Sequence, residues 1–476
     1  MNGRVGDFSI FLHPLERTMS ADSSIHIRRL DSRLEDIHLK MKELRQKLSP
    51  RGNVVSPSGK QRTIEIFGEP LTPQQTVERI CGEVRELGLC AVLDYSRRID
   101  RAELTAQTLR VPQEELAAAH AAADPEFLAA IRRVRERIVR FQSAILHQNV
   151  RIEVEHGWLS EWYRPLRRVG CCVPGGVAAY PSSVLMNCVP AQVAGVEEIA
   201  VIAPPTPTGS RNPDMLATCY EIGIQEVYRL GGAQGVASLA YGVADEAGKM
   251  IVPKVDKIVG PGNLFVALAK RYVYGEVGID SIAGPSEVVV IVDSTTRADY
   301  TAYDLLAQAE HAPGASILIG WDEVALNRVE AEIIQRFAAL DRGELARQSL
   351  ESFGAIILAQ NAEDACRLTD EIAPEHLHIA TENAEELAKK IRNAGAMFLG
   401  NFSPVALGDY AAGPSHTLPT SGTARFASGL SANDFLRPHS VQCFEPEGLE
   451  LLAPDVYELA TKEGLTAHRE SVEIRR

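Results

Sequence analysis

Long apolar runs and a surplus of positive charge are both missing from this 476-residue sequence. No apolar stretch approaches the roughly 18–20 residues that a helix needs to cross a bilayer. The first residues also lack the basic-then-apolar order of a secretory signal. Lysine and arginine total 49 against 63 aspartates and glutamates, a net charge of −14, which argues against a nucleic acid or a membrane as partner. We therefore expect a cytoplasmic protein.

Three short signatures of common sites are absent as well. The eight cysteines form no CxxC pair, and the adjacent Cys171 and Cys172 suit neither a tetrahedral metal site nor an ordinary disulfide. There is no HExxH, the signature of zinc proteases, and no GxGxxG, the dinucleotide fingerprint. Any metal site would have to combine ligands from distant segments, which one sequence cannot demonstrate.

Short β-branched runs alternate with helix-like stretches from about residue 166. VEEIAVIAPP, QEVYRLGG, KVDKIVGPGN and SEVVVIVD each lead into a glycine, proline or aspartate, and the same alternation continues after YTAYDLLAQAEH. This rhythm is typical of parallel sheets with helices on their faces. Residues 73–149 are helical in pattern, and Thr72 with Gln75 resembles a capping box. The sequence predicts two α/β domains and a helical N-terminal region.

An apolar heptad precedes these domains. Its members are spaced alternately three and four residues apart: Ile27, Leu30, Leu34, Ile37, Met41, Leu44 and Leu48. The pattern predicts a charged helix that ends at Ser49-Pro50. The helix could pair with a partner helix or pack on its own domain, and the pattern favours neither. We interpret residues 50–62 as a linker.

Glycine-rich turns follow two of the predicted strands and precede predicted helices. They are Gly231-Gly232-Ala233-Gln234-Gly235 and Gly260-Pro261-Gly262-Asn263, and Pro174-Gly175-Gly176 is a third such turn. Glycines let the backbone approach a phosphate at the free N–H groups of a helix N-terminus. Turns of this composition often bind nothing, so by themselves they leave nucleotide binding open.

Histidine is sparse, with six of the twelve residues at or after His311. Gln308 and His311 share one face of a predicted helix and could share a metal, although such a pair more often lies on the surface. Glu375 and His376 supply an adjacent carboxylate and imidazole suited to proton transfer. His376 with His378 as a metal pair, or a solvated loop, are the alternatives for that segment.

Two further polar segments lie towards the C-terminus. Asp409 and His416 fall in a loop crowded with glycine and proline, where rigid turns fix the position of binding groups. His468 follows Glu463 by five residues in a tail that is too short to form a domain and is expected to dock elsewhere.

Taken in order, these segments resemble the histidinol dehydrogenase family. The resemblance runs from about Thr63 to the C-terminus through VGPGNLFVALAK, IDSIAGPSEVVVI, DLLAQAEHAPGA, IAPEHL, GDYAAGPSHTLPTSGTARFASGL and EGLTAHRESV. It implies a zinc-dependent, NAD-linked oxidation of L-histidinol to L-histidine through L-histidinal. It also implies a homodimer in which the tail of one subunit completes the active site of the other.

The resemblance assigns roles to residues of this sequence. It implies four zinc ligands: Gln308, His311, Asp409 and His468. Glu375 and His376 match the catalytic pair, and His376 and the zinc ligands also match substrate-binding positions, together with Ser286, His416 and Glu463. Gln234 and Asn263 match positions that contact NAD. Cys172 stands where the family usually has a tyrosine, a loss that would weaken one contact to the cofactor.

The resemblance also implies an architecture of two incomplete, Rossmann-like, parallel-sheet domains. The first combines residues 63–157 with 286–430 and carries the zinc and catalytic residues, and the second, on the NAD side, is 158–285. Residues 1–62 form an N-terminal extension, and 431–476 form a short C-terminal dimerisation arm. Two other functions stay open: a dehydrogenase of another small polyol, such as a sulfonated diol, and a zinc hydrolase in which Glu375 and the metal activate water.

Overall fold

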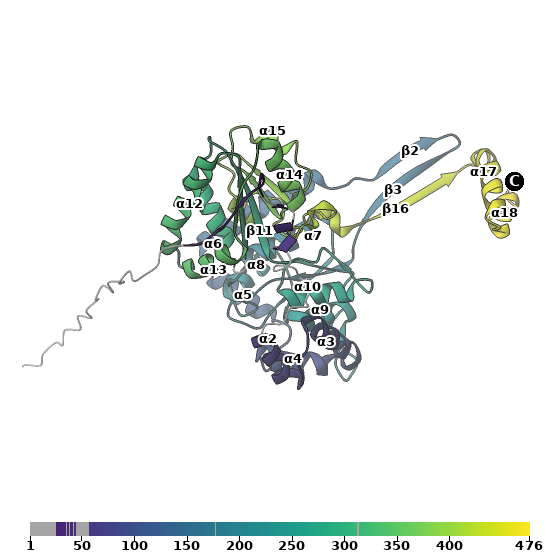
Figure 1. Ribbon diagram of the computed structural model, residues 1–476. Helices are drawn as coiled ribbons and strands as arrows, with labels where there is room; N and C mark the ends of the chain where they lie inside the picture. Colours follow the sequence, from purple (N-terminus) through teal and green to yellow (C-terminus); the bar gives the residue numbers. More distant parts are fainter. Residues whose placement is uncertain are drawn as a thin grey trace, which may run out of the picture.

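The computed structural model describes residues 25–34, 36–37, 39–40, 42–43, 57–176, 178–311 and 314–476. Within these ranges the strands form two parallel sheets, of six and of five strands, and a three-stranded antiparallel sheet that extends away from the body (Figure 1). Helices cover both faces of each parallel sheet. The α/β fold predicted from the alternating sequence pattern is therefore confirmed. No helix in the described ranges combines the length and the apolar composition that crossing a membrane requires.

The six-stranded sheet has the order β1-β13-β12-β11-β14-β15, and all its pairings are parallel. Its strands are β1 (Arg28–Asp31), β11 (Ser286–Val292), β12 (Gly314–Gly320), β13 (Ala355–Leu358), β14 (His376–Ile379) and β15 (Ala396–Leu399). The helices that follow them are α11 (Ala298–Ala309), α12 (Glu323–Arg336), α13 (Gly343–Phe353), α14 (Ala362–Ile372), α15 (Ala384–Ala388) and α16 (Val405–Tyr410). Alternate residues of β11 enter the apolar clusters on opposite faces, which is why its sequence is a continuous apolar run.

The five-stranded sheet has the order β10-β9-β4-β5-β6 and is also fully parallel. Its strands are β4 (Arg168–Cys172), β5 (Glu198–Ala203), β6 (Glu226–Arg229), β9 (Lys257–Val259) and β10 (Gly278–Ile279). Its helices are α7 (Pro181–Ala194), α8 (Pro213–Glu221), α9 (Gly232–Tyr241) and α10 (Leu264–Val273). Cys171 and Cys172 enter the clusters on opposite faces of β4, so the adjacent cysteines act as small core residues.

The helices between residues 57 and 145 cover the five-stranded sheet. They are α2 (Pro57–Phe67), α3 (Pro73–Leu87), α4 (Leu89–Asp100), α5 (Gln113–Ala122) and α6 (Pro125–Ile145). The capping box of Thr72 and Gln75 starts α3 as predicted. The apolar faces of α3 and α4 pack on α9 and α10, and those of α5 and α6 pack on α7 and α8. This packing differs from the expected division, which joined residues 63–157 to the six-stranded sheet.

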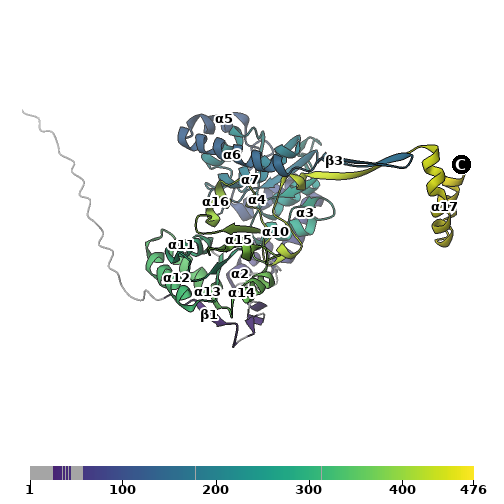
Figure 2. The same ribbon diagram turned by 90° about the horizontal axis from the view of Figure 1, so that it is seen from above.

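An arm projects from the body and ends in two helices (Figures 1 and 2). Its stem is β2 (Val150–Val154), β3 (Gly157–Pro165) and β16 (Leu436–Phe444), and its tip is α17 (Pro446–Lys462) and α18 (Thr466–Glu473). Many large apolar side chains on it are exposed: Val150, Ile152, Trp162, Phe444, Leu451, Leu452, Tyr457, Leu459, Leu465 and Ile474. Apolar surface of this extent is typical of interaction surfaces. The minor elements elsewhere are β7 (Val243–Ala244), β8 (Met250–Val252), η1 (Phe337–Ala339), η2 (Thr423–Arg425) and η3 (Ala432–Phe435).

The prediction of a helix that begins at Ile27 is wrong at its start, because Arg28–Asp31 forms strand β1. This strand pairs in parallel with β13, with Leu30 opposite Ile357. The pairing satisfies the backbone of an otherwise open sheet edge, which outweighs the local helical pattern. Leu34 is 82% exposed, so the heptad seam is not continuous. Met41, Leu44 and Leu48 lie outside the described residues, and the expected linker is helical from Pro57.

Replacing Leu30 with alanine is expected to lower the free energy of unfolding by about 2–4 kcal/mol, because Leu30 is buried in the core of the six-stranded sheet. The matched control is Leu34→Ala, which truncates an exposed member of the same heptad and should stay within about 0.5 kcal/mol. Urea titration followed by circular dichroism measures both. Equal losses in the two variants would favour a continuous helical seam instead.

Candidate active site

Several candidate residues gather at the amino-terminal edge of the six-stranded sheet. Ser286 begins β11, and His376 begins its neighbour β14. The segment from Gln308 to His311 ends α11 and leads into β12, the other neighbour of β11. Because the three strands are parallel, their starts lie at one edge. The topology thus joins groups that are up to ninety residues apart in the chain.

Glu375 is buried and firmly held. Its Oε2 accepts hydrogen bonds from Ser286 Oγ at 2.7 Å and from the backbone N–H of Glu287 at 2.9 Å. Burial raises the pKa of Glu375 above its ordinary value, although the charge of His376 and the two hydrogen bonds oppose the rise. The carboxyl group therefore has a fixed orientation and a higher proton affinity than a surface glutamate, two properties expected of a general base.

His376 lies between two carboxylates. Its Nδ1 is 3.2 Å from the carbonyl of Glu287 and 3.7 Å from Glu375 Oε2, while Nε2 is 3.4 Å from Asp409 Oδ1. Burial on its own would lower the pKa of His376, but the neighbouring carboxylates outweigh it and raise the pKa to about 9. The ring is thus poised to hold a proton. The pair Glu375-His376, predicted as a proton-transfer unit, is adjacent in space as well as in sequence.

Asp409 connects this pair to the other sheet. Its backbone carbonyl is 2.9 Å from His416 Nδ1, and His416 Nε2 is 3.3 Å from the hydroxyl of Ser183, at the start of α7. Burial would raise the pKa of the Asp409 carboxyl, but its hydrogen bond with His376 and the charge of that ring bring the pKa below its ordinary value. Burial lowers the pKa of His416, which favours the neutral ring, and its Nε2 can then accept a hydrogen bond from the hydroxyl of Ser183.

Gln308 and His311 lie at the end of α11, next to the other candidate residues at the amino-terminal edge of the six-stranded sheet. Gln308 is buried, its Oε1 is 3.4 Å from Ser286 Oγ, and its Nε2 has no hydrogen-bond partner among the described residues. His311 is exposed, with Nδ1 at 3.3 Å from the carbonyl of Gln308. A Cβ at Gly314 would collide with that same carbonyl, so only glycine lets the chain turn here into β12.

The chain therefore brings together most, but not all, of the predicted site. Ser286, Gln308, Glu375, His376, Asp409 and His416 form one connected group, and His311 adjoins it. Glu463 ends α17, and His468 lies in α18, both exposed at the tip of the arm. Figures 1 and 2 show this tip far from the six-stranded sheet. Within one chain, three of the four predicted zinc ligands lie near each other.

His378 does not pair with His376 as the alternative interpretation suggested. Its Nδ1 is 3.0 Å from Asp304 Oδ2 on α11, and its Nε2 is 2.9 Å from the carbonyl of Gly400. Both ring nitrogens thus have polar neighbours, and the ring links α11 to the end of β15. A His-x-His metal pair is not supported by this arrangement.

A second set of candidates lies at the carboxyl ends of the five-stranded sheet. Gln234, in the first turn of α9, is 1% exposed, and its Nε2 donates to Asp100 Oδ2 at 2.9 Å while its Oε1 has no partner among the described residues. Burial raises the pKa of Asp100 to about 6. Asn263 caps α10 by accepting from the N–H groups of Phe265 and Val266. These positions surround the glycine-rich turns.

Cys172 differs from its neighbours in this set. Its thiol is buried in the core under α9 and α10, and burial raises its pKa to about 12. A buried neutral thiol offers a ligand no surface. Cys172, which the resemblance places at a cofactor-binding position, is thus only 4% exposed, and its thiol packs in the core.

Sequence reasoning missed Ser183 and Asp100. The sequence around Ser183 predicts only an apolar helix. Asp100 is one of several charged residues at the end of α4. No local signal could have identified either residue. Each becomes a neighbour of the site through contacts that join segments more than a hundred residues apart.

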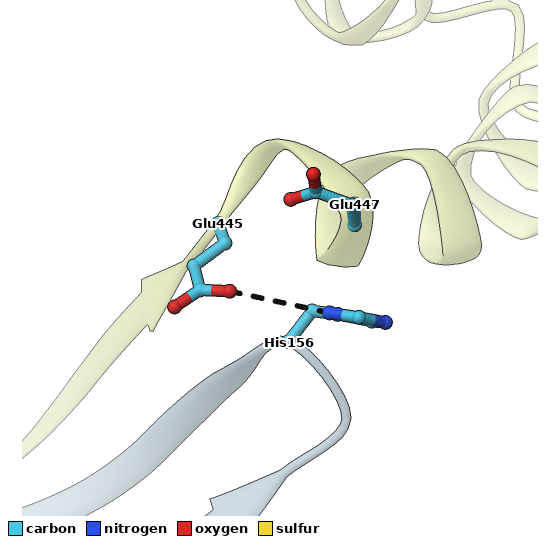
Figure 3. Close-up of side chains that lie close together, drawn as sticks. All are labelled: His156, Glu445 and Glu447. Atoms are coloured by element: carbon cyan, nitrogen blue, oxygen red, sulfur yellow. Dashed lines mark ion pairs between the residues drawn. The ribbon is translucent and has the colours of Figure 1, made fainter.

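Another cluster of possible metal ligands lies at the tip of the arm. His156, Glu445 and Glu447 are exposed, and their ligand atoms all lie within 4.8 Å of one another (Figure 3). Among the described residues it is the one cluster of at least three histidine, cysteine, aspartate or glutamate side chains at such distances. It contains none of the predicted zinc ligands, and exposed acidic groups often gather without an ion, so we assign it no metal.

The buried carboxylate–imidazole pair beside one parallel sheet and the glycine-rich turns of the other are features of an α/β enzyme. The chain belongs to the histidinol dehydrogenase family, because the family profile described as Histidinol dehydrogenase matches residues 70–476. The resemblance inferred from the motifs is thereby confirmed.

Individual relatives support this assignment. A histidinol dehydrogenase of Rhodopirellula baltica is 58% identical over 433 residues, which cover 91% of this chain and 93% of the relative. One of Geobacter metallireducens is 47% identical over 413 residues, 84% of this chain and 91% of the relative. The crystal structure of histidinol dehydrogenase from Elizabethkingia anophelis matches with a TM-score of 0.84 at 32% identity, covering 95% of this chain and 98% of that one.

Proposed function

We propose that this protein oxidises L-histidinol to L-histidine through L-histidinal, with NAD as the electron acceptor and zinc as a resident metal. The observation that carries the proposal is the buried Glu375-His376 pair, which is joined to Ser286 and Asp409 in a chain of the histidinol dehydrogenase family. We also infer a cytoplasmic location for this biosynthetic enzyme.

The residues at the sheet edge fit a zinc ion. Gln308, His311 and Asp409 offer a mixed nitrogen and oxygen donor set, and His468 of a second subunit would be the fourth ligand. One buried polar atom at this edge, Gln308 Nε2, lacks a hydrogen-bond partner among the described residues, as expected where a ligand belongs. Bound zinc would supply a Lewis acid that orients the amine and imidazole of the substrate.

The turns of the five-stranded sheet fit a dinucleotide. The orphaned Oε1 of Gln234 lies against Gly232, which has a φ of +60° and begins α9. Asp100 holds the NH₂ of Gln234, which leaves the amide oxygen without a partner among the described residues and suits it to a donor such as a ribose hydroxyl. Bound NAD would supply the acceptor for each hydride.

His376 and Glu375 each accept a proton at a different point of the two-step oxidation. In the first step the unprotonated form of His376, which becomes more abundant as the pH rises towards its pKa of about 9, accepts the hydroxyl proton as hydride leaves the carbon. The carboxylates of Glu375 and Asp409 stabilise the imidazolium that forms. The aldehyde then needs an oxygen from water before a second hydride can leave. Glu375, held by Ser286 and the N–H of Glu287, accepts the proton of that water. The two steps together transfer four electrons as two hydrides.

The remaining residues hold the substrate between the steps. His416 and Ser286 lie beside the catalytic pair, and Glu463 would come from the second subunit together with His468. Retaining the aldehyde in a closed site protects it from side reactions. The exposed apolar arm supports a homodimer, in which the tail of each subunit, residues 431–476, completes the site of the other.

Supplying L-histidinol and NAD is expected to produce two NADH for each histidine formed, measured by NADH absorbance and by chromatography of the product. Removing the metal with a chelator should lower the rate more than about 100-fold, and adding zinc should restore it. One NADH per substrate, or faster turnover of a sulfonated diol, would favour the other polyol dehydrogenase. Amide cleavage without NADH would favour a zinc hydrolase.

A further inference from the structure

A buried ion pair lies directly beneath one of the glycine-rich turns. Lys270, on α10, is 1% exposed, and its Nζ contacts Asp280, whose side chain is 5% exposed. Removing two charges from water is energetically costly, so a pair buried this completely is weak evidence of stabilisation in itself. The pair therefore calls for another explanation.

Both charged groups hold the same residue. The N–H of Gly260 donates to Asp280 Oδ2 at 2.7 Å, and the carbonyl of Gly260 accepts from Lys270 Nζ at 3.0 Å. Gly260 has a φ of +103°, and a Cβ there would collide with the carbonyl of Cys172 at the end of β4. The pair thus fixes a turn that only glycine can form, pressed against the carboxyl end of the central strand.

This turn lies near the start of the chain segment that joins the five-stranded sheet to the six-stranded sheet. It leads through Gly262 to Asn263, which caps α10. Asp280 Oδ1 also accepts from the N–H of Ser281 at 2.6 Å, and the chain then crosses to the other sheet and enters β11 at Ser286. One carboxylate therefore anchors both the turn that would receive the dinucleotide and the start of the segment that leads to the catalytic edge.

We propose that Lys270 and Asp280 are positioning residues, which hold the Gly260–Asn263 turn in the conformation that binds the dinucleotide. The inference rests on the proposed function, because it assumes that NAD binds at this turn. Neither side chain is proposed to touch the cofactor, since both lie beneath the turn. Their effect on binding acts through the two backbone groups of Gly260.

The test compares Lys270→Met and Asp280→Asn with the control Arg168→Met. Arg168 is 5% exposed and pairs with Glu198 and Glu226 at the opposite end of β4, so its loss removes a similar buried cation from the same sheet. NADH affinity is measured by fluorescence titration, and stability by thermal unfolding. We expect the NADH dissociation constant to rise roughly 10- to 100-fold in the two positioning variants and less than about twofold in the control.

The double variant Lys270→Met/Asp280→Asn separates positioning from stability, because it leaves no unpaired charge in the core. Its thermal midpoint should recover towards that of the wild type, while NADH binding stays weak because Gly260 still lacks its charged partners. Recovery of both properties, or an equal loss of NADH affinity in Arg168→Met, would overturn the proposal. If the wild-type protein binds no NADH, the proposed function itself fails.

Discussion

Replacing Glu375 with glutamine is expected to slow the oxidation of L-histidinal about 10²- to 10⁴-fold, while the oxidation of L-histidinol slows far less. Glutamine keeps the size of the side chain and can still accept from Ser286, but it cannot take a proton from water. Replacing His376 with asparagine should slow both oxidations by a similar factor, since the alcohol and the hydrated aldehyde must each lose a hydroxyl proton to this ring as hydride leaves. The two changes thus separate the proton transfers.

Single-turnover measurements give each step its own rate, with L-histidinol or L-histidinal as the starting substrate and NADH absorbance as the signal. The matched control is Glu382→Gln, the same change at an exposed carboxyl group three residues beyond β14, which should alter neither rate. Equal and mild losses in Glu375→Gln and His376→Asn would refute the assignment of the catalytic pair.

Mixing two inactive variants is expected to restore about one quarter of the wild-type activity. One variant carries His376→Asn in the body, and the other carries His468→Ala at the tip of the arm. If arms are exchanged, random pairing makes about half of the dimers mixed, and each mixed dimer has one site built from an intact body and an intact arm. The measurement is histidinol oxidation after the two variants are expressed together.

The control for this experiment mixes His376→Asn with Asp409→Ala, both of which change the body. In that mixture every site has a damaged body, so no activity should return. Mixed dimers are verified by purification through a different tag on each variant. Absence of recovery in verified His376→Asn/His468→Ala dimers would mean that the arm does not complete its partner's site.

The α/β architecture could be predicted because its signal is local. The run SEVVVIV forms β11, buried on both faces, and the capping box at Thr72 starts α3 as the sequence indicates. The helix prediction for the N-terminal segment was wrong because the conformation of that segment depends on a distant strand. Residues 28–31 meet the open edge of β13, more than three hundred residues later in the chain, and that pairing decides the backbone conformation.

The residues of the candidate site also fall into two groups: those with a local or motif signal in the sequence, and those placed only by contacts between distant segments. Glu375 and His376 could be identified because they are neighbours in the chain, and the family motifs pointed to Ser286 and Asp409. The roles of Ser183 and Asp100 follow from packing between distant helices, which has no local pattern. The Lys270–Asp280 pair depends on the register of β9 and β10, which brings Asp280 beneath Gly260.

The projecting arm also has a consequence for how this enzyme behaves at low abundance. If each site needs α18 of another copy, a solitary chain has an incomplete set of metal ligands and is silent, however well it folds. Turnover per chain then rises with protein concentration until the subunits are fully associated, in accordance with mass action. Dilution would act as a reversible off-switch, which a substrate could oppose only by binding the completed site and so favouring the associated form.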